Sequence, residues 1–163
     1  MLNIIKKIDF INEKIGTYAA YLLVPMILIT FCVAFMRYAL DFGSIAIQEL
    51  IIYLHALIFC VGAAYTLKNN MHVRIDIFYD GFTENKKKLI NFYGTIFFLL
   101  PTCIVIFVTS FNYVLSSILL LESSKEAGGL PFLYILKSYI LILSALLFLQ
   151  GISELIKNLQ GQK

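Results

Sequence analysis

The chain has 163 residues, of which 60% are hydrophobic and only 14% are charged, and its mean hydropathy is +0.86. A soluble domain this small leaves a large share of its surface in water, so the composition excludes a soluble fold and predicts an all-α integral membrane protein. The net charge of +3 does not indicate a nucleic-acid-binding protein, because the cations lie between long apolar runs and are not gathered on one polar face.

Residues 2–15 have the pattern of an amphipathic helix that lies in the membrane interface. The isoleucines of this segment fall along one side of a helix, and its lysines and acidic residues cover the rest. The apolar side of such a helix enters the boundary between headgroups and acyl chains, and its cations lie near anionic lipids. A frayed basic terminus is the alternative interpretation.

Four stretches that are uncharged, or that carry a single charge, follow this segment. About 20 helical residues cross the roughly 30 Å of hydrocarbon in a bilayer. We therefore predict transmembrane helices at residues 16–37, 45–67, 89–120 and 131–154, within a single four-helix membrane domain over residues 1–163. The first stretch is too long for the apolar part of a cleaved signal peptide, which indicates a permanent anchor. The third is too long for a straight crossing, and Pro101 offers a position for a kink.

The distribution of lysine and arginine predicts that both termini are cytoplasmic. With the N-terminus inside, the inner segments hold ten of the 13 Lys and Arg residues, and the outer segments hold only Arg37, Lys125 and Lys137. Short cytoplasmic loops of membrane proteins carry such an excess of positive charge. The expected topology is therefore N-in, C-in.

The second span carries a seam of polar and small residues at near-heptad spacing. Such a mixture is typical of helix packing in lipid. His55 lies nearly two turns deeper than Glu49 and on a different flank of the helix, so the two side chains cannot form a proton relay. For His55, a hydrogen-bonded packing role is favoured over a role as ligand or proton carrier. The residues of the seam are Gln48, Ile52, His55, Phe59, Gly62 and Thr66.

The sequence does not indicate an enzyme, a metal site or a cofactor on this chain. It has only two histidines, and it contains no nucleophile elbow, phosphate loop or dinucleotide fingerprint. Cys32, Cys60 and Cys103 are far apart in apolar runs, so neither a disulfide framework nor a redox pair is expected. The middle of each span is almost wholly apolar, whereas carriers place polar groups there. We therefore expect a helical bundle built to contact another membrane protein.

Two segments make the pattern more specific. Gln48 and Glu49 open the second span, Gly62 lies in its inner half, and Lys68-Asn69-Asn70-Met71-His72-Val73-Arg74-Ile75-Asp76 follows it. A turn of Gly129, Leu130 and Pro131 leads into the fourth span, which carries Lys137 near its start. This arrangement resembles the small membrane subunit of tripartite ATP-independent periplasmic (TRAP) transporters. Unlike many members of that family, the chain has no tryptophan, and after Pro131 it has no proline early in the fourth span, where it reads Tyr139-Ile140-Leu141-Ile142.

The resemblance implies a small scaffold subunit of a sodium-coupled, binding-protein-dependent secondary transporter in the bacterial inner membrane. Such a transporter imports an organic acid, for example a C4-dicarboxylate or a sialic acid. The implied partners are a large membrane subunit, which carries the sodium and substrate sites, a periplasmic substrate-binding protein, and membrane lipids. No sodium or other cofactor is expected on this chain. A small membrane carrier that works alone as an oligomer is the alternative function.

The resemblance also assigns expected roles to single residues. Glu49 and Lys137 present charge at the outer mouth, with Lys125 and Glu126, or pair with the large subunit. For Glu49, capping of its own helix is an equal alternative, and for Lys137 the simpler role is to extend its amine to the outer surface. The inner loop is expected to be fixed through hydrogen bonds and ion pairs of His72, Arg74 and Asp76.

Overall fold

The computed structural model describes residues 2–72 and 81–159, and all the regular secondary structure of these residues is helical. Four rods are long and apolar enough to cross a membrane, namely Ile5–Ala39, Ile45–Lys68, Asn85–Leu119 and Leu133–Leu159. They confirm the predicted all-α chain with four potential spans. The elements are α1 (Leu2–Tyr21), α2 (Leu23–Ala39), α3 (Ile45–Lys68), α5 (Glu84–Gly94), the π-helical η1 (Thr95–Leu99), α6 (Leu100–Leu119) and α7 (Leu133–Leu159).

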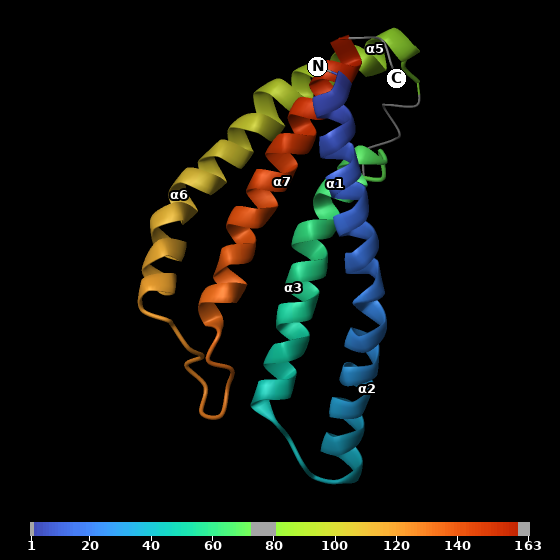
Figure 1. Ribbon diagram of the computed structural model, residues 1–163. Helices are drawn as coiled ribbons and strands as arrows, with labels where there is room; N and C mark the ends of the chain where they lie inside the picture. The colour runs from blue at the N-terminus through green and yellow to red at the C-terminus, as the bar shows by residue number, and fades with distance from the viewer. Residues whose placement is uncertain (1, 73–80, 160–163) are drawn as a thin grey trace.

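The first rod consists of α1 followed by α2, with only Leu22 between them (Figure 1). Pro25 has no N–H group to bond the carbonyl of Tyr21, which explains why the helix is interrupted there. The N–H of Leu22 instead bonds the carbonyl of Ala19, three residues back, at 3.1 Å. α1 therefore extends past residue 15, where the sequence predicts the end of the interfacial segment. The interfacial location of residues 2–15 stays a prediction.

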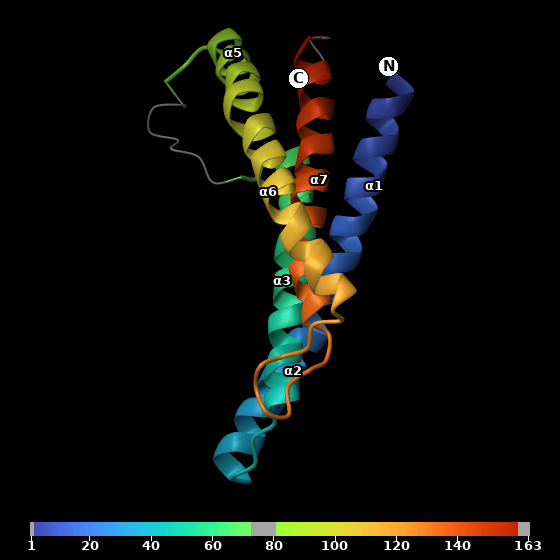
Figure 2. The same ribbon diagram turned by 90° about the vertical axis from the view of Figure 1, so that its left-hand side faces the viewer.

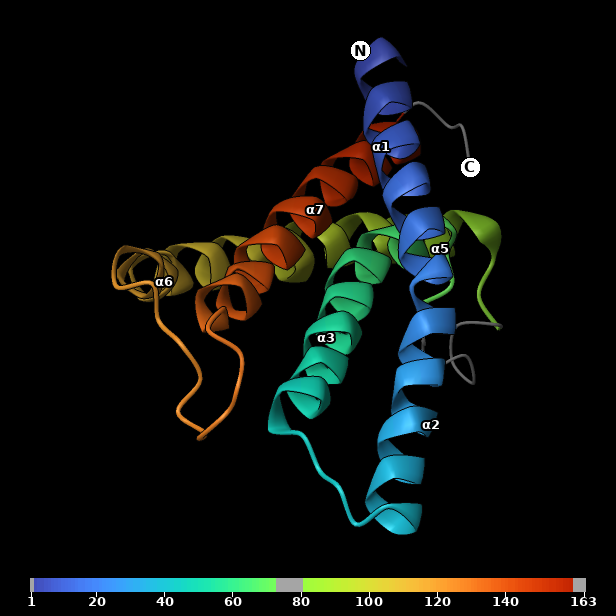
Figure 3. The ribbon, with the colours of Figure 1, turned by 60° about the horizontal axis from the view of Figure 1, so that its bottom comes forward.

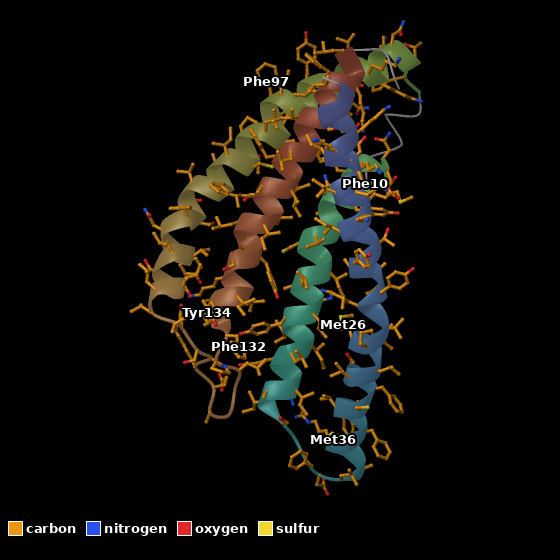
Figure 4. All side chains as sticks on the ribbon, in the orientation of Figure 1. Phe10, Met26, Met36, Phe97, Phe132 and Tyr134 are labelled. Carbon is orange, nitrogen blue, oxygen red and sulfur yellow. The ribbon has the colours of Figure 1, made fainter. Side chains whose placement is uncertain are left out.

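The third rod contains a π-helical turn, η1, between α5 and α6. Pro101 has no N–H group for the carbonyl of Phe97, and the N–H of Leu100 reaches back five residues to the carbonyl of Thr95. The irregular turn thus ends two residues before Pro101, the proline that the sequence singles out for a kink. Phe97 projects outward from this turn with 65% of its surface exposed (Figure 4).

The spanning helices form one curved layer and not a bundle (Figures 1 and 3). α6 packs on α7, α7 packs on α3, and α3 packs on α2, while α1 contacts both α3 and α7. The expectation of a bundle is therefore wrong. In water, apolar side chains would drive the helices to close into a bundle. In lipid, acyl chains cover these side chains as well as another helix does, so the layer can stay open.

The two ends of the layer differ in what they contain. Both chain termini lie at one end together with α5, whereas the loops 40–44 and 120–132 lie at the other (Figures 1 and 2). We call these the terminal end and the loop end. The two termini thus share one end of the molecule, as the predicted topology requires.

Contacts within the layer are narrow stripes. Met26 and Met36 lie half-buried on the side of α2 toward α3 (Figure 4), and no residue of α2 is fully buried. In α3 the buried residues are Tyr53, Val61 and Ala64. Both broad faces of the layer consequently remain apolar and open.

Candidate functional site

Glu49 connects α3 to the 120–132 loop at the loop end. One oxygen of its carboxylate, Oε2, accepts a hydrogen bond from the backbone N–H of Leu130 at 2.6 Å, and the other, Oε1, accepts one from the hydroxyl of Ser124. A Cβ atom added to Gly129 would lie 2.8 Å from Oε1 of Glu49 and 2.5 Å from Oγ of Ser124. A side chain at position 129 would therefore force the side chains of Ser124 and Glu49 to shift. The carboxylate of Glu49 therefore holds the loop through hydrogen bonds, a role that neither sequence-based alternative describes.

The 120–132 loop is also folded by its own backbone. The N–H of Ser124 bonds the carbonyl of Leu130 at 3.0 Å, and the N–H of Gly129 bonds the carbonyl of Glu126 at 3.0 Å. Gly128 adopts a φ of +82°, a conformation in which side chains are strained. Pro131 is exposed and ends the loop two residues before α7 begins. Lys125 and Glu126 are exposed on this loop, between the two tied segments.

Lys137 makes an ion pair within the chain. Its Nζ lies 2.5 Å from Oε2 of Glu122 and 4.2 Å from the centre of the Tyr113 ring. The hydroxyl of Ser117 donates a second hydrogen bond to Glu122 at 2.7 Å. The hydrogen bond from Lys137, followed by the one from Ser117, lowers the pKa of Glu122 below its ordinary value. Lys137 thus joins α7 to the end of α6, so its charge already has a partner in this chain.

His72 folds back onto the end of α3. Its Nε2 lies 3.0 Å from the carbonyl oxygen of Ala63 and 3.2 Å from Oγ1 of Thr66. Because a carbonyl oxygen only accepts, Nε2 carries the proton and donates it to Ala63. The bond occupies a carbonyl near the C-terminal end of the helix. Arg74 and Asp76, predicted to fix the same loop, lie outside the described residues.

A buried polar network, which the sequence analysis does not predict, joins α1 to α7 at the terminal end. Gln150 is fully buried. Its amide bonds Asn12 at 2.6 Å, Asp9 at 3.1 Å and Glu154 at 3.1 Å. Lys157 lies 2.7 Å from Asp9 and 2.8 Å from Glu154. Asn12 of α1 is thus buried against α7, and Asp9 is half-buried there.

α1 also meets α3 closely. A Cβ atom added to Gly16 would lie 2.5 Å from two ring atoms of Tyr65, so the glycine lets the ring pack directly on the backbone of α1. An ion pair between Glu13 and Lys68 lies beside this contact. Together with the polar network, this contact fastens α1 to both of its neighbours.

The middle of the seam of α3 faces away from the rest of the layer, whereas Gln48, Gly62 and Thr66 are half-buried. Ile52 and Phe59 are 56% and 66% exposed, and His55 is exposed between them. A Cβ atom added to Gly62 would meet nothing within 4 Å. Within the described part of the chain, the ring of His55 makes no hydrogen bond. The hydrogen-bonded packing role expected for His55 is therefore not found within this layer.

A family model decides what kind of protein these contacts belong to. The model for the DctQ component of tripartite ATP-independent periplasmic transporters matches residues 26–161, which is most of the chain. The chain belongs to the DctQ family. The resemblance stated from the sequence is thereby confirmed, and so is the conclusion that the chain is a transporter component and not an enzyme. No curated protein and no solved structure matches the chain closely enough for comparison.

The hydrogen-bonded polar side chains described above make structural contacts within this DctQ chain, and they do not form a catalytic arrangement. Among the residues described here, no group of three or more His, Cys, Asp or Glu side chains is arranged to hold a metal ion. The three cysteines are free. A groove between α6 and α7 near mid-depth is lined by apolar residues such as Cys103, Phe107 and Phe148, and it offers no charged group to a carboxylate.

Sequence reasoning singled out Glu49, Gly129 and Lys137 in this DctQ chain but missed the partners of two of them. Ser124 and Glu122 are those partners, and each lies in a short loop with several other polar residues. A signal for the network on α7 did exist. Its polar residues recur on one helical face at spacings of three and four, which is the pattern of a polar stripe buried against a neighbour. These residues are Gln150, Ser153, Glu154 and Lys157.

Proposed function

We propose that this DctQ chain is the small scaffold subunit of a sodium-coupled, binding-protein-dependent secondary transporter that imports an organic acid. Its task is to support a large transport subunit in the membrane. The observation that carries this proposal is the open single layer of helices, whose polar contacts lie at its two ends and whose middle is apolar. Such a layer offers two broad apolar faces on which another membrane protein can pack.

The same observation argues against a carrier that works alone. Carriers bind solute near the midplane with polar groups and broken helices. Here the hydroxyls of Thr30, Thr109 and Ser144 are bonded to carbonyls of their own helices, which leaves them little capacity to bind solute. His55 makes no such bond, and it faces outward from the layer. The role of a small oligomeric carrier is therefore the less supported alternative.

The proposal places the remaining functions on partners. The large subunit would carry the sodium and substrate sites, and a periplasmic binding protein would deliver a carboxylate such as a C4-dicarboxylate or a sialic acid. The excess of lysine at the terminal end supports a bacterial inner-membrane location with both termini in the cytoplasm. The loop end, with exposed Lys125 and Glu126, would then face the periplasm.

Reconstitution tests this function. Uptake of a radiolabelled C4-dicarboxylate and of a labelled sialic acid is measured in proteoliposomes with an inward sodium gradient. The vesicles contain this chain alone, the large subunit with the binding protein, or all three components. We expect uptake of one of the two acids only with all three components, and its loss when the sodium gradient is collapsed. Uptake by this chain alone would instead support the oligomeric carrier.

A further inference from the structure

The outward face of α3 presents a polar group where lipid would be a poor neighbour. We call the residues Gln48, Ile52, His55, Phe59, Gly62 and Thr66 the His55 face. Gln48 and Thr66 are 18 residues apart, which at 1.5 Å per residue gives about 27 Å, close to the thickness of the hydrocarbon layer. His55 is the eleventh of the 24 residues of α3, so its ring lies near the middle of the helix. The face thus runs through the whole depth of the membrane.

The opposite side of α3 already has its neighbours. Tyr53, Val61 and Ala64 are buried where α3 packs on α7, α1 and α2. The His55 face points about half a turn away from these residues, because His55 follows Tyr53 by two positions. A second helix can therefore pack on the middle of this face, at Ile52, His55 and Phe59, without displacing any contact of the layer. Thr66, at the inner end of the face, already contacts His72 at 3.2 Å.

His55 indicates what kind of neighbour this is. An imidazole facing acyl chains has a donor and an acceptor that hydrocarbon cannot satisfy, and ionisable residues inside membranes almost always face protein or water. Gly62 has no side chain, which lets another helix approach closely. Gly62 also leaves an open notch, since a Cβ atom there would meet nothing within 4 Å. The neighbour is thus a protein helix with a polar side chain at mid-depth.

We infer that a transmembrane helix of the large transporter subunit packs along the His55 face, with a polar side chain of that helix hydrogen-bonded to the His55 ring. This inference rests on the proposed function, in which this chain is one component beside a larger membrane protein. Phe59 packs against that helix, and a side chain of the helix fills the notch at Gly62. The following test distinguishes the large subunit from lipid and from a second copy of this chain on the same face.

Site-specific photocrosslinking decides who covers the face. A photoreactive phenylalanine analogue replaces Phe59, which is 66% exposed on α3, or Phe31, which is 68% exposed on α2 and serves as the matched control. The full transporter is irradiated in native membranes. We expect an adduct with the large subunit from position 59 and its absence from position 31. An adduct with a second copy, lipid labelling without a protein adduct, or equal labelling at both positions would overturn the assignment.

Substitution of the ring tests the hydrogen bond itself. Recovery of the large subunit with an affinity-tagged small subunit is measured over a detergent dilution series. His55→Leu is expected to weaken association by about 3-fold to 30-fold, the range for one hydrogen bond between membrane helices. His55→Gln keeps a donor and an acceptor and is expected to restore most of the association. Full association of His55→Leu would contradict the hydrogen bond.

The wild-type protein separates the failure of this inference from the failure of the proposed function. If the wild-type chain recovers the large subunit but position 59 gives no adduct with it, the scaffold role stands, and the inference that the large subunit packs on the His55 face is wrong. If the wild-type chain recovers no large subunit, the scaffold role itself fails. Gly62→Leu, compared with Gly94→Leu at another helical glycine whose added Cβ meets nothing, provides a second check. Only the change at Gly62 is expected to reduce recovery.

Discussion

The carboxylate of Glu49 accepts a hydrogen bond from the backbone N–H of Leu130 at 2.6 Å, which fixes the loop before α7 to the start of α3. These two residues are 81 positions apart in the sequence. A second bond, from the hydroxyl of Ser124, ties the other limb of the same loop. One acidic side chain therefore ties both limbs of the 120–132 loop to α3.

Replacing Glu49 should loosen this loop. Glu49→Leu removes both acceptors and leaves the N–H of Leu130 without its partner, at an expected cost of about 1–3 kcal/mol. Thermal unfolding in detergent can be followed with a thiol-reactive dye once the exposed Cys32 and the half-buried Cys60 are replaced by serine, because Cys103 is only 3% exposed in the folded chain. Glu126→Leu, at an exposed position of the same loop, is the control and should leave the midpoint nearly unchanged. Equal midpoints for the two variants would show that the tie at Glu49 contributes no stability.

Gly129 should not tolerate a side chain. In Gly129→Ala, the new methyl group would lie 2.5–2.6 Å from the side chain of Ser124 and 2.8 Å from Oε1 of Glu49, so the tie must shift. Overpacking of this kind typically costs about 1–3 kcal/mol. Gly43→Ala, in the other loop at the same end, meets nothing within 4 Å and is the matched control. Proteolysis of the loop should be faster in Gly129→Ala alone; equal digestion of both variants would contradict this prediction.

The polar network at the terminal end should show strong coupling between Asn12 and Gln150. Gln150→Leu leaves the buried amide of Asn12 without its acceptor at 2.6 Å, so it should destabilise the chain by about 1–3 kcal/mol. Adding Asn12→Leu removes the unsatisfied group and should recover part of that loss. A double-mutant cycle from unfolding in denaturing detergent measures the coupling. Additive effects of the two substitutions would mean that the bond does not fasten α1 to α7.

A feature of the fold can be predicted from the sequence only where a physical property of the residues indicates it. An uncharged run of sufficient length identifies a span, so the second span, predicted at residues 45–67, differs by one residue from α3 at Ile45–Lys68. The lateral arrangement leaves no such signal, because in lipid an apolar face looks the same whether it meets a helix or an acyl chain. For that reason the sequence does not distinguish an open layer of helices from a bundle.

The polar contacts show the same limit. Helical spacing correctly placed Gln48, His55 and Gly62 on one face but did not tell whether that face is covered within this chain. Asn12 and Gln150 are 138 positions apart, and the sequence shows that each needs a partner without showing which partner it finds. Lys137 illustrates this limit, because the sequence predicts a contact with the outer surface or with another subunit, whereas the structure pairs Lys137 with Glu122.

This pair predicts how stability responds to acid. Hydrogen bonds from Lys137 and Ser117 lower the pKa of Glu122 below the ordinary value of 4.5. A carboxyl group whose pKa is lower in the folded chain stabilises it above the unfolded pKa, and this contribution is lost as the pH falls through the folded pKa. The unfolding midpoint should therefore decrease below about pH 4.5 in the wild-type chain and less steeply in Lys137→Met. Arg37→Met, at an exposed position of the loop end, should keep the wild-type slope. If Lys137→Met also keeps that slope, the ion pair does not determine the acid response.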